Sequence, residues 1–225
     1  MNFLARLFIL LAFLGAQSSA LTQPVGRANV TELPEGWTQL VAYDSKGLSL
    51  NGGEKHIPMQ GVAFLNASRN MLLIVESTAS GNNGRSVSWV SMKCPQPKAD
   101  YFTNDYGANQ TPRDTRCLVV NTKYSSKNYL TEVSPPTAEA VEKQGLRFEK
   151  GQLIRTWSGI KGGSFLKIYF FKTSAFQTGS GMAKVGEAGV DPALIAFGES
   201  LQQLVYDSTL SLSGNLSFQL LNTIK

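Results

Sequence analysis

Histidine is almost absent from this chain, whose 225 residues include only His56. A Ser-His-acid hydrolase needs a histidine base, and no serine here lies in a G-x-S-x-G turn to work with one. A lone imidazole would also need several carboxylates beside it to hold a metal ion. We therefore expect His56 to be a loop residue, and we expect no metal site.

Cysteine is nearly as scarce, with only Cys94 and Cys117. Two thiols are too few for a closed four-cysteine zinc site. In an oxidising compartment such a pair normally forms a disulfide. Closing a loop of this length stabilises a fold by roughly 3 kcal/mol, so we predict a Cys94–Cys117 bond.

Phosphate-binding loops are missing as well. The glycine-rich stretches at 159–163 and 179–181 lack the spacing of a P-loop, so no nucleotide or other cofactor is expected. Residues 164–167 match the S-x-x-K pattern of some serine nucleophiles, but they open a predicted strand, whereas that motif belongs at the start of a helix. We interpret the match as chance.

Long apolar runs are confined to the first twenty residues. Arg6 precedes an apolar stretch from Leu7 to Phe13, and the small residues Ser18 and Ala20 suit a signal peptidase. We predict a signal peptide over 1–20, cleaved before Leu21, because the run is too short to span a bilayer comfortably. The mature chain would then have no transmembrane segment and would reside in a bacterial periplasm or be secreted.

Strand signals follow in quick succession after a polar stretch, 21–36, which we interpret as a flexible lead-in. The turns between the strands are too short for parallel crossovers, so neighbouring strands should be antiparallel. The clearest predicted strands are Thr38–Tyr43, Val62–Asn66, Met71–Ser77, Ser86–Lys93, Cys117–Lys123, Gln152–Ser158, Phe165–Lys172 and a final one within Leu216–Leu220.

Two helices are predicted among these strands. One begins at Ser134-Pro135-Pro136 and ends at Gly145, and the other begins at Asp191-Pro192. An apolar stripe with spacings of three and four marks the second helix. It consists of Leu194, Phe197, Leu201 and Leu204.

The order of elements predicts one α+β domain over 37–225. A mainly antiparallel sheet with the two helices packed on one side is the simplest arrangement. A β-sandwich with helical additions is the alternative.

A basic and aromatic sheet face is the first candidate binding site. Arg155 and Trp157 share one face of a predicted strand, and Lys167 and Tyr169 share one face of the next. If these strands pair as a hairpin, the four side chains can combine charge with aromatic surface. Such a face could bind an anionic lipid or glycan, or it could be an ordinary solvated or helix-covered sheet face.

The segment between the cysteines is the second candidate site. Tyr101, Asp105 and Tyr106 combine aromatic rings with a carboxylate, which is a set that can contact a sugar ring. The spacing matches no EF-hand. A structural loop closed by the disulfide is the plainer interpretation.

These observations favour an exported, non-catalytic envelope or secreted protein that binds an anionic surface, a glycan or an envelope protein. The net charge of +5 is mildly basic, but export argues against nucleic acid as the partner. Two alternatives remain open. One is a secreted hydrolase-type enzyme with a carboxylate or Ser/Lys centre, and the other is a structural or assembly subunit.

Overall fold

The computed structural model describes residues 22–45, 58–79, 94, 99–105, 114–160, 165–173, 191–211 and 214–224. The predicted signal peptide, the predicted strand Ser86–Lys93, His56 and Tyr106 lie outside these residues.

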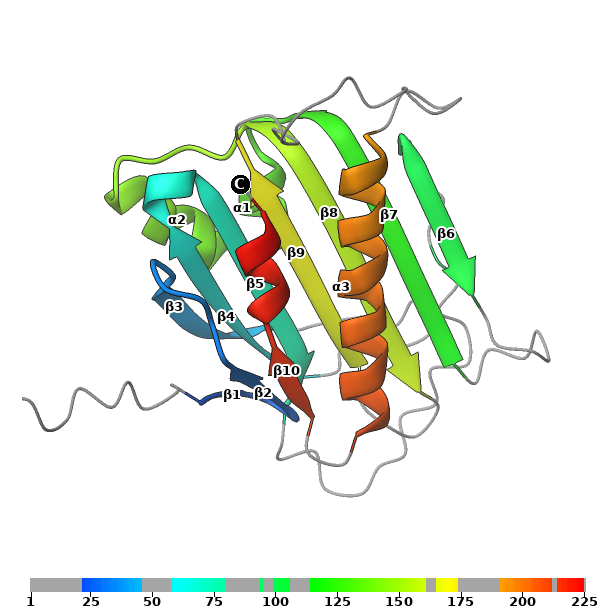
Figure 1. The fold of residues 1–225 in the computed structure, drawn as a ribbon. Helices are drawn as coiled ribbons and strands as arrows, with labels where there is room; N and C mark the ends of the chain where they lie inside the picture. Colours follow the sequence, from blue (N-terminus) through cyan, green and yellow to red (C-terminus); the bar gives the residue numbers. More distant parts are fainter. Residues whose placement is uncertain are drawn as a thin grey trace, which may run out of the picture.

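The centre of the molecule is a seven-stranded antiparallel sheet (Figure 1), which confirms the predicted α+β class. Its strands lie in the order β3-β4-β5-β9-β8-β7-β6. Their bounds are β3 Thr38–Ser45, β4 Met59–Asn66, β5 Met71–Thr78, β6 Tyr101–Asp105, β7 Asp114–Ser125, β8 Lys150–Ile160 and β9 Phe165–Lys172. Strand β5 is buried along its whole length, as expected for a central strand covered on both faces.

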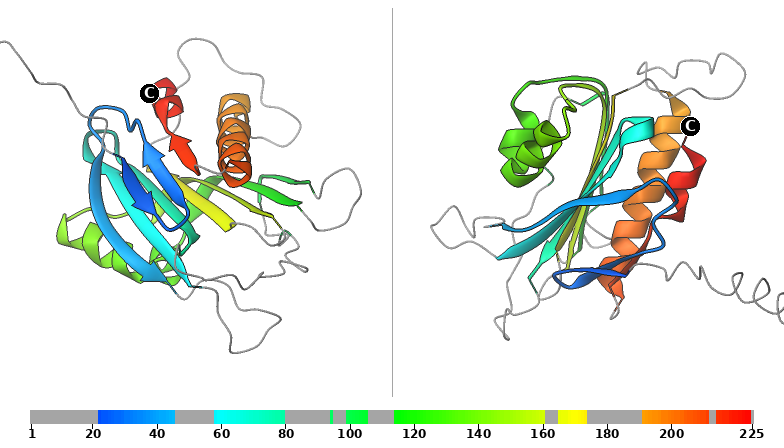
Figure 2. Two further views of the ribbon diagram at one scale, coloured as in Figure 1. Left: turned by 90° about the horizontal axis from the view of Figure 1, so that it is seen from below. Right: turned by 90° about the vertical axis from the view of Figure 1, so that its left-hand side faces the viewer.

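The helices cover both faces of this sheet (Figure 2), so the prediction that they pack on one side is wrong. Helix α3 (Pro192–Leu210) lies across β7, β8 and β9 on one face. Helices α1 (Tyr129–Val133) and α2 (Pro135–Lys143) lie on the other, where α2 packs against β3. Both faces of the sheet must be covered, because successive residues of β5 and β9 point to opposite faces and are mostly apolar on each.

The helix boundaries follow from local chemistry. The Asp191 side chain accepts a hydrogen bond from the Ala193 N–H at the start of α3. Gly145 follows α2 with φ +70°, a left-handed conformation that favours glycine. The short α1 was not predicted, since its five residues carry no side-chain cap and no repeating stripe.

The N-terminal stretch is not a loose lead-in, contrary to the prediction for 21–36. It contains β1 (Gln23–Val25) and β2 (Ala28–Thr31), which form a three-stranded sheet with β10 (Asn215–Ser217). The predicted final strand, 216–220, is correspondingly shorter, because a 3-10 helix, Gln219–Thr223, follows β10.

Candidate functional site

The predicted basic and aromatic residues do come together on one hairpin. In the β8–β9 pairing, Arg155 lies opposite Tyr169 and Trp157 lies opposite Lys167. The four side chains therefore share the sheet face that α1 and α2 partly cover. Both rings are largely buried, with 7% of Trp157 and 8% of Tyr169 exposed.

Lys167 is held by a carboxylate that the sequence analysis did not select. Its Nζ lies 2.6 Å from Oε2 of Glu76 on β5, and 4.8 Å from the centre of the Tyr169 ring. The Lys167 side chain is 21% exposed and that of Glu76 only 3%. The lysine charge is thus balanced within the sheet.

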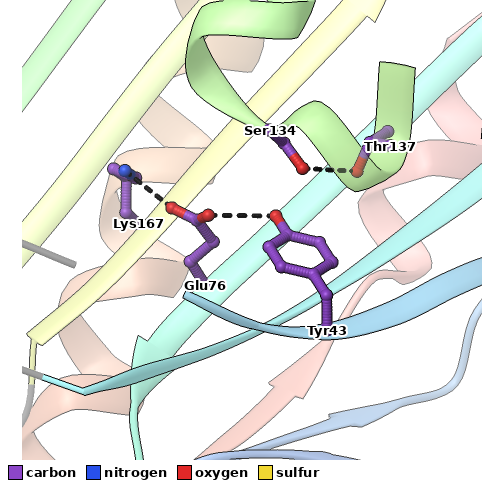
Figure 3. A network of polar contacts seen from close by, with 5 residues as sticks. All are labelled: Tyr43, Glu76, Ser134, Thr137 and Lys167. Carbon is purple, nitrogen blue, oxygen red and sulfur yellow. Dashed lines mark hydrogen bonds and ion pairs between the residues drawn. The ribbon is translucent and has the colours of Figure 1, made fainter. Parts of the chain in front are cut away.

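Tyr43 completes this polar network from the edge strand β3 (Figure 3). Its hydroxyl donates a 2.9 Å hydrogen bond to Oε1 of Glu76. The pair of hydroxyls on Ser134 and Thr137, 2.7 Å apart at the start of α2, lies beside the Tyr43 phenol.

The network follows one transverse row of the sheet, in which each residue lies opposite the next. The row runs through Tyr43, Gly61, Glu76, Lys167, Trp157 and Cys117. Only the strand register reveals it. Glu76 is the lone acidic residue of β5 and directly follows the apolar run Met71–Val75. That position was the one signal in the sequence that could have marked a buried carboxylate.

The pKa values of these groups respond to burial and to one another. Burial, followed by the charge of Glu76, raises the pKa of Tyr43. For Lys167, burial lowers the pKa, but the interactions with Tyr169 and Glu76 raise it by more than burial lowers it. The pKa of Lys167 is therefore above its usual value. Burial raises the pKa of Tyr169.

Arg155 connects the sheet to α1. Its Nη1 donates a 3.1 Å hydrogen bond to the Tyr129 hydroxyl, and Nη2 lies 3.5 Å from Oδ1 of Asn121. Burial raises the pKa of Tyr129 to about 12, opposed by the Arg155 charge. Both predicted cations therefore bind residues of their own chain.

Of the predicted site between the cysteines, the structure places Tyr101 and the backbone of Asp105, whereas Tyr106 lies outside the described residues. The Tyr101 hydroxyl at the start of β6 donates a 2.8 Å hydrogen bond to Glu199 of α3, which fastens this edge strand to the helix. Asp105 is the last residue of β6. The predicted Cys94–Cys117 disulfide is present, with its Cα atoms 5.7 Å apart.

An open groove lies between α1, α2 and the segment that leads into β8. We call it the α1–α2 groove; its volume is about 250 Å³. Its lining consists of Lys127, Leu130, Thr131, Ala138, Val141, Glu142, Leu146, Arg147, Phe148 and Glu149. Sequence patterns did not indicate this groove, because α1 itself was not predicted.

Among the described residues, no cluster of three or more His, Cys, Asp or Glu side chains could hold a metal ion. No helix in the described ranges is long and apolar enough to cross a membrane.

Comparison of the chain with protein families, with curated proteins and with solved structures gave no match.

Proposed function

We propose that this is an exported, non-catalytic envelope or secreted protein that binds a polypeptide partner through the α1–α2 groove. The observation that carries the proposal is the make-up of this groove, whose lining combines apolar residues with charges of both signs. The Cys94–Cys117 disulfide supports export, because such bonds persist in oxidising compartments.

The groove is better suited to a polypeptide than to an anionic surface. Leu130, Val141 and Phe148 lie beneath the groove with at most 7% of each exposed, so they offer a small apolar contact to one side chain of a partner. The rim carries two cations, Lys127 and Arg147, and also the carboxylates Glu142 and Glu149. Arg147 and Glu149 already lie 3.8 Å apart as an ion pair. The carboxylates repel a phosphate or a polyanion, whereas a peptide with acidic and basic residues beside an apolar anchor can complement charges of both signs.

The buried network argues against the enzyme alternative. Tyr43, Glu76 and Lys167 are the ionisable groups that converge most closely in the described sheet. Glu76 is only 2% exposed, so its carboxylate cannot touch a substrate in this conformation.

A large apolar docking patch, expected of an assembly subunit, is not seen in the described ranges. There, Leu210 is the one large hydrophobic residue that is exposed, at 53%.

The test is fluorescence polarisation with labelled 12-residue peptides that carry one central Leu or Phe between acidic and basic residues. We expect saturable binding that the charge reversals Glu142→Lys and Arg147→Glu weaken at least tenfold. Lys150→Glu, an exposed reversal outside the groove lining, is the matched control and should bind like wild type. Vesicles with anionic lipid form the second arm. Binding to vesicles but to no peptide would overturn the proposal in favour of an anionic surface.

A further inference from the structure

We infer that residues 214–224 act as a C-terminal clasp that docks the N-terminal hairpin β1–β2, which cannot dock stably on the large sheet without it. The two segments stand at opposite ends of the chain yet lie side by side (Figure 1).

Backbone pairing joins the clasp directly to the hairpin. Strand β10 runs parallel to β2, with Asn215, Leu216 and Ser217 opposite Asn29, Val30 and Thr31. The Asn29 N–H also donates a 2.9 Å hydrogen bond to the Gly214 carbonyl. A hairpin of three- and four-residue strands is too small to be stable alone, so this third strand completes it.

The apolar side chains of hairpin and clasp are buried in the same core cluster. On the hairpin they are Val25, Ala28 and Val30, and on the clasp they are Leu216, Phe218, Leu221 and Ile224. None of the seven is more than 3% exposed. Removing the clasp would therefore expose the inner face of the hairpin.

Polar contacts strengthen the same junction. The Glu32 carboxylate, at the end of β2, accepts hydrogen bonds from the Ser217 hydroxyl and from Nε2 of Gln219. Glu32 has φ +53°, a strained conformation that these contacts help to hold. At the far end of the clasp, Nη1 of Arg69 donates a 3.0 Å bond to the Ile224 carbonyl.

By comparison, the hairpin is held to the large sheet mainly at its turn. The Gly26 N–H donates to Oε1 of Gln60 at 3.1 Å, and the Arg27 N–H donates to the Thr78 carbonyl at 2.9 Å. The strands on either side of this turn depend on the clasp.

The dependence of the hairpin on the clasp would set the order of signal-peptide cleavage and hairpin docking, a consequence that rests on the proposed export. The predicted cleavage site before Leu21 lies two residues ahead of β1. Because the clasp is synthesised well after the hairpin, the hairpin stays undocked and the cleavage site stays accessible until the clasp has emerged.

Hydrogen exchange measured by mass spectrometry on the intact mature chain tests the clasp. We expect the double variant Leu216→Ala/Phe218→Ala to accelerate exchange at least tenfold in peptides covering 22–31, while peptides from β5 and β9 keep their protection. Leu210→Ala removes an exposed leucine close by and serves as the control, with exchange unchanged throughout.

A milder variant, Ser217→Ala, covers the case in which the double variant fails to fold, and it should give a smaller acceleration confined to the same peptides. Unchanged protection of 22–31 in both variants, or an equal loss in β5 in the milder one, would overturn the clasp. Because no export step enters this measurement, recovery of the uncleaved full-length chain from cells would contradict the proposed export and leave the clasp intact.

Discussion

Tyr43 and Gly61 lie directly opposite each other on β3 and β4, and the missing side chain of Gly61 leaves the space that the Tyr43 ring occupies. A Cβ at Gly61 would collide with the ring carbons and hydroxyl of Tyr43. The ring can therefore cross β4 and reach Glu76 on β5. A glycine in the middle of a strand is explained here by one close approach.

We expect Gly61→Ala to lower the free energy of unfolding by roughly 1–3 kcal/mol, the usual cost of overpacking. Urea denaturation measures the change. Because the Tyr43 ring is the obstacle, the same substitution should cost much less in a Tyr43→Ala background. Equal costs in the two backgrounds would show that the ring is not responsible.

The Glu76–Lys167 pair should behave as a buried ion pair. Lys167→Met alone should cost about 3–5 kcal/mol, because it leaves a carboxylate buried without its partner. The double variant Glu76→Leu/Lys167→Met should recover much of that loss. The exposed pair Glu139–Lys143 is the matched control, and Lys143→Met should change stability little. Additive losses in the buried pair would contradict the coupling.

Alkaline pH should destabilise the fold through Lys167 and the buried tyrosines Tyr43, Tyr129 and Tyr169. All four have pKa values raised above their ordinary values of 10.5 for lysine and 10.0 for tyrosine, so their folded forms hold protons that the unfolded chain releases first. Their contribution is complete below about pH 10 and is lost as pH rises above it. Urea unfolding between pH 8 and 11 should show this decline, and Tyr43→Phe should make it shallower. A wild-type decline that begins below pH 9 would point to other groups.

The proposed export predicts the covalent state of the mature protein. Mass spectrometry of exported protein should give a chain that starts at Leu21, and non-reducing peptide maps should recover the Cys94 and Cys117 peptides linked. Full-length chain recovered from membranes would contradict cleavage.

Local patterns determined much of the secondary structure. Asp191-Pro192 and the stripe from Leu194 to Leu204 predicted α3, because capping and helical spacing act within a few residues. Alternating residues and a glycine-rich turn likewise predicted the β8–β9 hairpin, with Arg155 and Trp157 on one strand face and Lys167 and Tyr169 on another, but the register that joins the two faces came from the structure.

Such local patterns could not predict which residues the candidate site residues contact. Lys167 meets Glu76 only because β9 pairs with β5, and Arg155 meets Tyr129 only because α1 crosses that sheet face. The sequence therefore predicted where the cations gather but not that they are balanced internally.

The N-terminal stretch shows the same division between local and distant information. Val25, Ala28 and Val30 are too few to mark strands by themselves, and their covering partners Leu216 and Phe218 lie some 190 residues away. Residue types and short spacings determined which segments become helices and strands, because propensity, capping and alternation are local effects. Only the tertiary structure decided which strands adjoin and which charges are paired, because strand register depends on contacts between distant parts of the chain.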